Sequence, residues 1–393
     1  MRGGWSLGLV LLLGCSGGEP APSGVATLGA TFRAPEDAVG ALLGDVEPDG
    51  PAARAGLRGY DLIQALDGAP VEGPCALERL LLERKPGQEV TLAIRRGREA
   101  LEETVELADA LALYGAGCEA GRAASCHALG TLHLQGRVGP VDFERAAQLF
   151  EQACEAGSAD ACADLGICHL NGTGVTADDA RARELFARAC GGESAAGCGH
   201  LAFVYATGRG VPQDDFRAVA YFRKACDGGD AEGCYNLGLH FDNGRGSIEN
   251  KSLAVAAYTH GCELGSSRAC TNVGYLHQHG LGTPQNLRQM LAFYTRGCRG
   301  APCGTGDPTG CFNLGVLHRD GIGAGVDKTR AAAYFEESCA GNSPLGCANL
   351  ADLLAAGDGV PRDEDRAAEL FRRACEGGHQ VSCENLAALE KSP

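Results

Sequence analysis

The chain has 393 residues, 45% of them hydrophobic, so it is long enough for two domains or one extended array and too apolar for wholesale disorder. Its formal charge of −16 argues against a nucleic-acid backbone as the partner. The 59 glycines are about twice the usual share and require many turns, and the 20 cysteines indicate either metal clusters or disulfides, depending on the compartment.

The N-terminal segment places Arg2 before an apolar run over residues 7–13. A positive charge before a short apolar core is typical of a secretory signal, and the run is too short to remain as a transmembrane helix. Leu12-Leu13-Gly14-Cys15 resembles the bacterial lipobox, which implies removal of a signal peptide at residues 1–14 and lipidation of Cys15. Residues 15–24 are rich in Gly, Pro and Ser, as expected of a flexible tether. A plain signal peptide with a chance cysteine is the alternative.

Residues 25–108 carry strand and turn signals around short helices. Residues 61–66, 90–94 and 103–107 alternate wholly or in part between apolar and polar residues, Asp67-Gly68 is a hairpin signal, and residues 75–83 carry leucines at helical spacing. We therefore expect a small α+β domain.

A longer pattern within this segment is Val46-x-Pro48-x-x-Pro51-Ala52-x-x-Ala55-Gly56-Leu57, followed by Asp61-x-Ile63 and Asp67-Gly68. This pattern resembles a PDZ domain of the bacterial periplasmic protease type. Tyr60 departs from it, because that family usually has Gly immediately before the Asp. The resemblance implies binding of an extended peptide, often a C-terminus, at an exposed sheet edge.

The same resemblance assigns the residues of the peptide groove. Backbone amides around Leu28, Gly29 and Ala30 would hold a terminal carboxylate, and Leu77, Leu80 and Leu81 would line the side-chain pocket. The alternative is that these leucines are simply core residues.

Between residues 110 and 390 the cysteines recur with a fixed period. The first member of each pair returns every 36 residues, with one step of 41, and its partner follows eight residues later, or thirteen where five residues are inserted. A fixed period of this length predicts a solenoid of helix pairs. The pairs are Cys118 and Cys126, Cys154 and Cys162, Cys190 and Cys198, Cys226 and Cys234, Cys262 and Cys270, Cys298 and Cys311, Cys339 and Cys347, and Cys375 and Cys383.

Other columns follow the same period. An aromatic residue stands four before most of the first cysteines, a small residue follows the second cysteine at four, and a glycine follows it at ten. The small residue would let two helices pack closely, and the glycine would end the first helix in a left-handed cap. The glycines are Gly136, Gly172, Gly208, Gly244, Gly280, Gly321 and Gly357.

These columns resemble Sel1-like repeats, and the paired cysteines match the cysteine-rich Hcp branch of that group. The resemblance implies an all-α, α/α superhelical array over residues 110–390, with seven full repeats and terminal half-units. The eight-residue spacing fits neither zinc sites nor thioredoxin-like motifs, so with a secretion signal it predicts structural disulfides, each contributing roughly 2–3 kcal/mol.

Three further cysteines have separate expectations. Cys168 occupies a column otherwise filled by Leu or Val, which predicts a buried, inert thiol. Cys75 opens a predicted helix, and we expect a partly buried free thiol there rather than an activated one. Cys303 lies in the insertion and would compete with Cys298 for Cys311.

Signals for chemistry are missing from the sequence. The Hcp branch is associated with binding or hydrolysing β-lactams, but no serine here has a lysine three residues later, and there is neither a His-Glu-x-x-His nor a Walker motif. We therefore expect no catalytic residue, no metal and no cofactor.

One regular column on the repeats is a candidate binding surface. It consists of His133, His169, Tyr205, Phe241, His277 and His318, which stacked repeats would align as a ribbon for an extended peptide. Core packing with a polar tip toward solvent is the alternative.

These observations predict a non-catalytic adaptor that binds proteins or peptides. We expect a monomer without nucleic-acid partners, lipid-anchored to the bacterial envelope, with the periplasmic face of the outer membrane favoured by Ser16 after the lipidated cysteine. A β-lactam- or peptidoglycan-directed binding protein, weakly hydrolytic, and a purely structural envelope spacer remain as alternatives.

Overall fold

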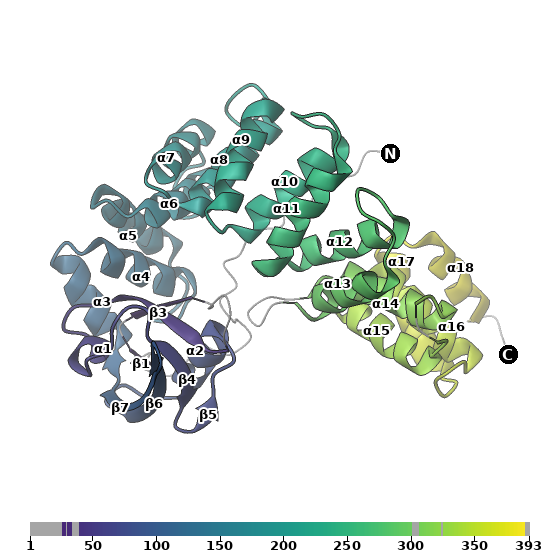
Figure 1. Cartoon of the computed structure of the whole chain (residues 1–393), viewed down its shortest axis with the longest axis horizontal. Helices are drawn as coiled ribbons and strands as arrows, with labels where there is room; N and C mark the ends of the chain where they lie inside the picture. The colour runs from purple at the N-terminus through teal and green to yellow at the C-terminus, as the bar shows by residue number, and fades with distance from the viewer. Residues whose placement is uncertain (1–25, 29, 34–38, 301–305, 324, 390–393) are drawn as a thin grey trace. The chain divides into compact units, whose positions relative to one another are not determined.

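The computed structural model describes residues 26–28, 30–33, 39–300, 306–323 and 325–389 (Figure 1). Cys15, Gly29 and Cys303, and the side chain of Cys75, lie outside the described part. Two compact units divide the chain, Met1–Gly192 and Glu193–Pro393, and each is described by itself. No helix in the described ranges has the length and apolar character needed to cross a bilayer.

The N-terminal part of the first unit is an antiparallel sheet with two short helices. The strand order is β2-β3-β4-β6-β7, and β5 pairs with β4 beside this path. Two further short strands, β1 and β8, pair with each other. The elements are β1 (Ala26–Thr27), β2 (Ala30–Arg33), β3 (Ala41–Val46), α1 (Pro51–Arg54), β4 (Leu62–Leu66), β5 (Ala69–Pro70), α2 (Pro74–Leu82), β6 (Glu89–Arg96), β7 (Glu99–Glu106) and β8 (Ala108–Asp109).

Alternation along the strands builds the core of this sheet. In β6 the residues Val90, Leu92 and Ile94 are buried while their neighbours are more exposed, because successive side chains point to opposite faces. Asp67 and Gly68 both have positive φ, of 49° and 79°, and connect β4 to β5. The predicted hairpin at Asp67-Gly68 is thereby confirmed.

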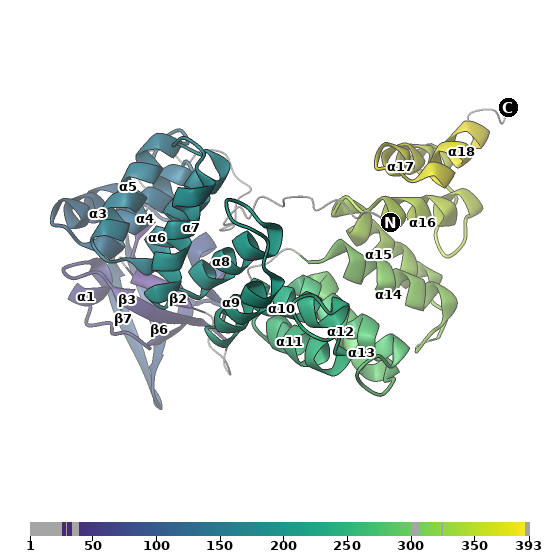
Figure 2. The same ribbon diagram turned by 90° about the horizontal axis from the view of Figure 1, so that it is seen from above.

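The rest of the described chain is a succession of helix pairs in chain order (Figures 1 and 2). Each repeat has a first helix and a second helix. The helices are α3 (Ala110–Glu119), α4 (Ala123–Leu134), α5 (Phe143–Glu155), α6 (Ala159–Asn171), α7 (Asp179–Gly191), α8 (Ala195–Thr207), α9 (Asp215–Asp227), α10 (Ala231–Asn243), α11 (Lys251–Glu263), α12 (Ser267–His279), α13 (Leu287–Arg299), α14 (Pro308–Asp320), α15 (Lys328–Ala340), α16 (Pro344–Ala356), α17 (Glu364–Glu376) and α18 (Gln380–Leu389).

Recurring residues define both ends of the helices. The predicted glycine column ends the first helices from α6 to α16 in the left-handed conformation, with φ between 64° and 73°. Six residues after each glycine an Asp or Asn caps the second helix, as when Asp142 accepts a hydrogen bond from the Arg145 amide at 2.9 Å. This capping column is regular in the sequence, yet it was not predicted. Its members are Asp142, Asp178, Asp214, Asn250, Asn286, Asp327 and Asp363.

The small residues of the first helices lie against the aromatic rings of the second. A Cβ added to Gly166 would lie 2.5 Å from the Phe186 ring, and one added to Gly315 would lie 2.5 Å from Phe335. Both rings are fully buried. The close helix packing predicted from these two columns is therefore present, and a larger residue at the glycine would push the helices apart.

The cysteines confirm the expectation of one disulfide per repeat. Seven bonds join the end of one helix to the start of the next with Cα atoms 4.4–4.9 Å apart, and Cys190 and Cys198 are also disulfide-bonded. Cys168 is a free thiol, 4% exposed, and burial raises its pKa to about 11. The seven bonds are Cys118–Cys126, Cys154–Cys162, Cys226–Cys234, Cys262–Cys270, Cys298–Cys311, Cys339–Cys347 and Cys375–Cys383.

Tyr60 holds a backbone conformation that favours glycine. Its φ is 72° and its side chain is 73% exposed, at the position where the PDZ pattern has Gly. We predict that Tyr60→Gly stabilises the sheet domain by about 1 kcal/mol, because it removes a steric penalty of roughly 1–2 kcal/mol and loses some chain entropy. Hydrogen exchange of β3 and β4 measures the change. Gly56→Ala, at φ 73° with open space around the Cβ position, is the matched control and should destabilise. Faster hydrogen exchange in β3 and β4 of the Tyr60→Gly variant would contradict the claim that Tyr60 strains the backbone.

Candidate peptide-binding surfaces

The sheet of the first unit has two edge strands, and only one suits an added peptide strand. β7 carries Glu99, Glu102, Glu103 and Glu106, a row of carboxylates that repels both other strands and a carboxyl-terminated peptide. Within the described residues β2 pairs with β3 alone, so its other side is an open edge, and the strand carries no acidic residue. The candidate peptide site is therefore β2.

The predicted carboxylate-binding loop is held in place by the buried residue Leu28. Leu28 is 1% exposed and belongs to the sheet core, and its carbonyl accepts a hydrogen bond from the Ala52 amide at 2.9 Å. Ala30 pairs with Val46 as the first residue of β2, and Gly29 between them lies outside the described residues. Leu28 thus fixes the loop, and its side chain is not available to a ligand.

The predicted pocket leucines divide into core and surface. Leu77 is fully buried and Leu81 is 6% exposed, so both are core residues, which is the alternative that the sequence left open. Leu80 is half-buried against the same core, as are Ala30 and Phe32 of β2. These three incompletely covered apolar side chains are the ones that remain for a peptide. Sequence reasoning missed Phe32, although its place on an edge strand was a signal.

A buried polar cluster ties the sheet to the first repeat. The hydroxyl of Ser125 in α4 contacts both carboxylate oxygens of Glu47 at 2.8 and 2.9 Å, and Nε of Arg122 lies 2.5 Å from the same carboxylate. Ser125 is fully buried and Glu47 is 7% exposed. Asp109 ends β8 and also caps α3 by accepting from the Ala112 amide at 2.9 Å. The PDZ-like sheet is therefore joined to the first repeat by buried contacts and a shared cap.

The predicted His column packs between helices. His277 stacks on Phe293 with ring centroids 5.6 Å apart, and His318 stacks on Tyr334 at 5.4 Å. Tyr205 stacks likewise on Tyr221 at 5.7 Å, Phe241 is 5% exposed, and burial lowers the pKa of His133. His169 contacts the Thr176 carbonyl of the following loop through Nδ1 at 3.3 Å. The rings of Tyr205, His277 and His318 thus lie between a first helix and the second helix that follows, which matches the packing alternative.

A different column of the second unit lies where a ligand can reach it. Consecutive first helices, α8 with α10, α10 with α12, α12 with α14 and α14 with α16, contact each other directly and so form one face. In the first helices from α10 to α18, a half-buried asparagine stands two residues after the second cysteine, and these residues form a column of Asn236, Asn272, Asn313, Asn349 and Asn385. Sequence reasoning missed it, although the signal Cys-x-Asn recurs in five consecutive repeats.

The asparagines have different partners. Asn349 accepts from Arg319 at 2.7 Å and donates to the Leu345 carbonyl at 2.9 Å. The side-chain amides of Asn236 and Asn313 form no hydrogen bond with any described residue. Three residues further along α10, α12 and α14 an apolar residue adjoins the asparagine, and Tyr275 among these is 49% exposed. The apolar members are Leu239, Tyr275 and Val316.

Family models match both parts of the chain. A model of the PDZ domain matches residues 26–107. A model of the Sel1 repeat matches residues 123–158, 159–192, 195–230, 231–266, 267–300, 308–343 and 344–379, together more than half of the chain.

Two comparisons extend these matches. The chain is 43% identical over 70 residues to a probable periplasmic serine endoprotease, DegP-like, of Halomonas elongata, a stretch that is 18% of this chain and 15% of that protein. A protective antigen of uropathogenic Escherichia coli displaying an SLR fold is similar in structure, with a TM-score of 0.59, 26% identity and coverage of 72% of this chain and 60% of that one. A Sel1 repeat protein from Oxalobacter formigenes shares the fold, with a TM-score of 0.57 and 22% identity over 71% of this chain and 79% of that one. This chain thus spans a small part of the protease and less than two thirds of the antigen.

The buried cluster predicts coupled stability across the junction. Ser125→Ala removes a buried hydrogen bond to a charged group, which costs about 1.5–3 kcal/mol. We expect amide exchange to rise roughly 10- to 100-fold in β3, α1 and the start of α4 together, since about 1.4 kcal/mol corresponds to tenfold. Hydrogen exchange with mass spectrometry on the full chain measures it. Glu106→Gln on exposed β7 is the control, and a rise confined to α4 would refute the coupling.

Proposed function

The chain belongs to the Sel1 repeat family, and from that premise we propose that it is a membrane-tethered, extracytoplasmic adaptor. It binds one peptide segment at its PDZ groove and another at the first-helix face of its repeats. PDZ and Sel1 repeats are protein-interaction modules, which supports a protein-binding scaffold role. The observation that carries the proposal is the asparagine column, with two unpaired amides, beside an apolar column on one face.

The asparagine column suits the backbone of an extended peptide. Each amide offers both an acceptor and donors, so Asn236 and Asn313 can bond to the C=O and N–H groups of a segment that runs across the helices. Leu239, Tyr275 and Val316 lie one turn further along the same helices and would contact its apolar side chains. An asparagine recurring within helices is not explained by helix propensity, which is below average for this residue.

The PDZ groove supplies the second contact by strand addition. The open edge of β2 offers backbone groups, and the half-buried Phe32 and Leu80 offer an apolar wall. The carboxylates of β7 direct an anionic chain end away from the other edge.

The proposed location is supported by the N-terminal sequence and the disulfides. Disulfides persist in oxidising compartments, and the protease similar to the PDZ part is named as periplasmic. Lipidation at Cys15 would tether the chain to the periplasmic face of the outer membrane. Two sites on one chain raise the effective concentration of the second after the first has bound.

The repeat face is tested by removing the two unpaired amides. Asn236→Ala with Asn313→Ala removes contacts worth about 1 kcal/mol each, so affinity for the partner should fall roughly tenfold or more while the fold is kept. The protein captured from envelope extract by the oxidised chain from residue 16 is titrated against each variant. Asn171→Ala, an exposed asparagine outside the column, is the control. Unchanged affinity in the double variant would remove the repeat face from the proposal.

The PDZ groove is tested separately with a library of C-terminal peptides. Leu80→Glu should abolish binding without unfolding the sheet, because Leu80 is only half-buried, whereas the buried Leu81 would report stability instead. Amidating the peptide C-terminus should weaken binding if a carboxylate is held. If no peptide binds the unaltered chain, the groove has no such role, and cell-wall fragments and β-lactams become the ligands to test.

A further inference from the structure

One position of the repeat lies, in several repeats, against the disulfide-bonded cysteines of the repeat before it. It lies two residues before each first cysteine, from the second repeat onward. Its side chain comes from the last turn of the second helix and reaches back toward the preceding helix junction. The residues are Gln152, Arg188, Lys224, His260, Arg296, Glu337 and Arg373.

The contacts of this position recur along the chain. Arg188 donates to the Cys154 carbonyl at 2.6 Å, and Arg373 donates to the Cys339 carbonyl at 3.1 Å. Oε1 of Gln152 lies 3.5 Å from Sγ of Cys118. A ring nitrogen of His260 and the sulfurs of Cys226 and Cys234 all lie within 4.8 Å of one another. The residue at this position thus differs in charge from one of these disulfides to the next.

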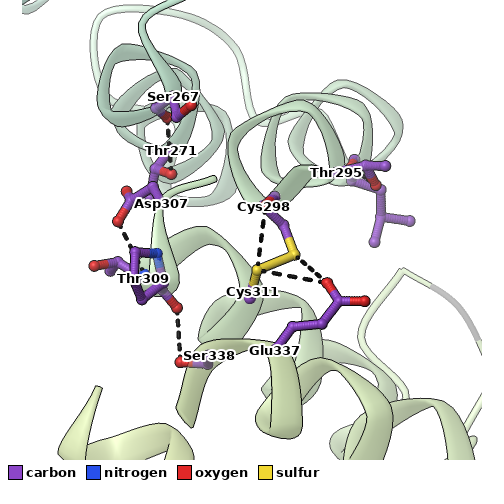
Figure 3. The surroundings of a disulfide bond; sticks show 11 residues. Ser267, Thr271, Thr295, Cys298, Asp307, Thr309, Cys311, Glu337 and Ser338 are labelled. Atoms are coloured by element: carbon purple, nitrogen blue, oxygen red, sulfur yellow. Dashed lines mark hydrogen bonds between the residues drawn. A yellow bond between two sulfur atoms is a disulfide. The ribbon is translucent and has the colours of Figure 1, made fainter. Parts of the chain in front are cut away.

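Glu337 is the single acidic member of the column. Its Oε2 lies 3.1 Å from Sγ of Cys298 and 3.8 Å from Sγ of Cys311, as Figure 3 shows. The two cysteines are 5% and 4% exposed, while Glu337 itself is exposed. No described Lys, Arg or His forms an ion pair with this carboxylate, so its charge is not neutralised locally.

The neighbouring polar groups of the junction are engaged elsewhere. Ser338 donates to the Pro308 carbonyl at 2.8 Å, and Asp307 accepts from the Thr309 amide at 3.0 Å. Figure 3 shows both bonds on the side of the junction away from Glu337. Glu337 is therefore the charged side chain that contacts both sulfurs of this disulfide.

Thiol–disulfide exchange is sensitive to such a charge. A thiolate attacks one sulfur of the disulfide, a mixed disulfide forms, and the other cysteine leaves as a thiolate. In the transition state the negative charge of the attacking thiolate is shared among three sulfurs. A carboxylate in contact with these sulfurs opposes the build-up of that charge.

We propose that Glu337 is an electrostatic guard that slows thiolate attack on the Cys298–Cys311 disulfide. The pair needs this protection more than the others, because its loop of thirteen residues is the only one whose sequence encloses a further cysteine. Disulfides that meet an arginine at this position, such as Cys339–Cys347 beside Arg373, have the opposite bias and exchange more readily.

The test measures the reduction rate of each disulfide in the full oxidised chain. Every variant carries Cys303→Ser, so that exchange comes only from added thiol. Glutathione, which is anionic, and cysteamine, which is cationic, are compared by timed alkylation and peptide mass spectrometry. Glu337→Gln should accelerate reduction of Cys298–Cys311 by glutathione roughly tenfold, corresponding to about 1.4 kcal/mol, and by cysteamine much less. The other disulfides are internal references and should not change.

Two further results decide between charge and simple shielding. Arg373→Glu should slow glutathione attack on Cys339–Cys347, and Arg373→Gln should slow it less. A Glu337→Gln rate that is unchanged, or raised equally for both thiols, would overturn the proposal, because a side chain that only blocks access cannot distinguish the charge of the reductant.

Discussion

The disulfide at each helix junction is the constraint on which the repeat architecture depends. It holds the last turn of a second helix within 4.4–4.9 Å, Cα to Cα, of the next first helix across a short turn. With the junction fixed, a glycine on each first helix meets a buried ring on the second, as Gly166 meets Phe186. Because every repeat is closed in the same way, side chains with the same place in the repeat come into register along one face. A binding surface on such an array is therefore a property of columns and not of single residues.

The sheet domain packs against the first repeat of this array through buried contacts. Glu47 follows β3 directly, and the turn after it leads into α1, whose Ala52 amide holds the Leu28 carbonyl beneath the candidate carboxylate loop. The same Glu47 carboxylate is bound by Ser125 and Arg122 of the first repeat. A fragment that ended after β8 would lack Ser125 and Arg122, the two side chains that bind this carboxylate. The groove and the first repeat therefore form one structural unit, and variants of the whole chain are better probes than isolated fragments.

Periodic signals in the sequence predicted most of the fold. The 36-residue period of the cysteines predicted the repeats and the disulfides, and Asp67-Gly68 predicted a hairpin. Both predictions succeeded because each structure is determined by residues close together in the sequence. The candidate site was predicted less well. The PDZ resemblance assigned Leu77 and Leu81 to the pocket, yet their burial is decided by the sheet that they pack against. The His column and the asparagine column are equally regular, and only tertiary contacts show that the first packs between helices while Asn236 and Asn313 remain unpaired.

The most direct test of the binding account is site-specific photo-crosslinking of the chain in its own envelope. A photoreactive phenylalanine analogue is placed at Tyr275 on the asparagine-bearing face, at Phe32 on the edge strand, and at Phe216 as a control, which is 77% exposed on a second helix. The account predicts adducts to a protein partner from positions 275 and 32 and none from 216. Adducts from position 216 alone, or from none of the three, would contradict the claim that these two surfaces bind protein.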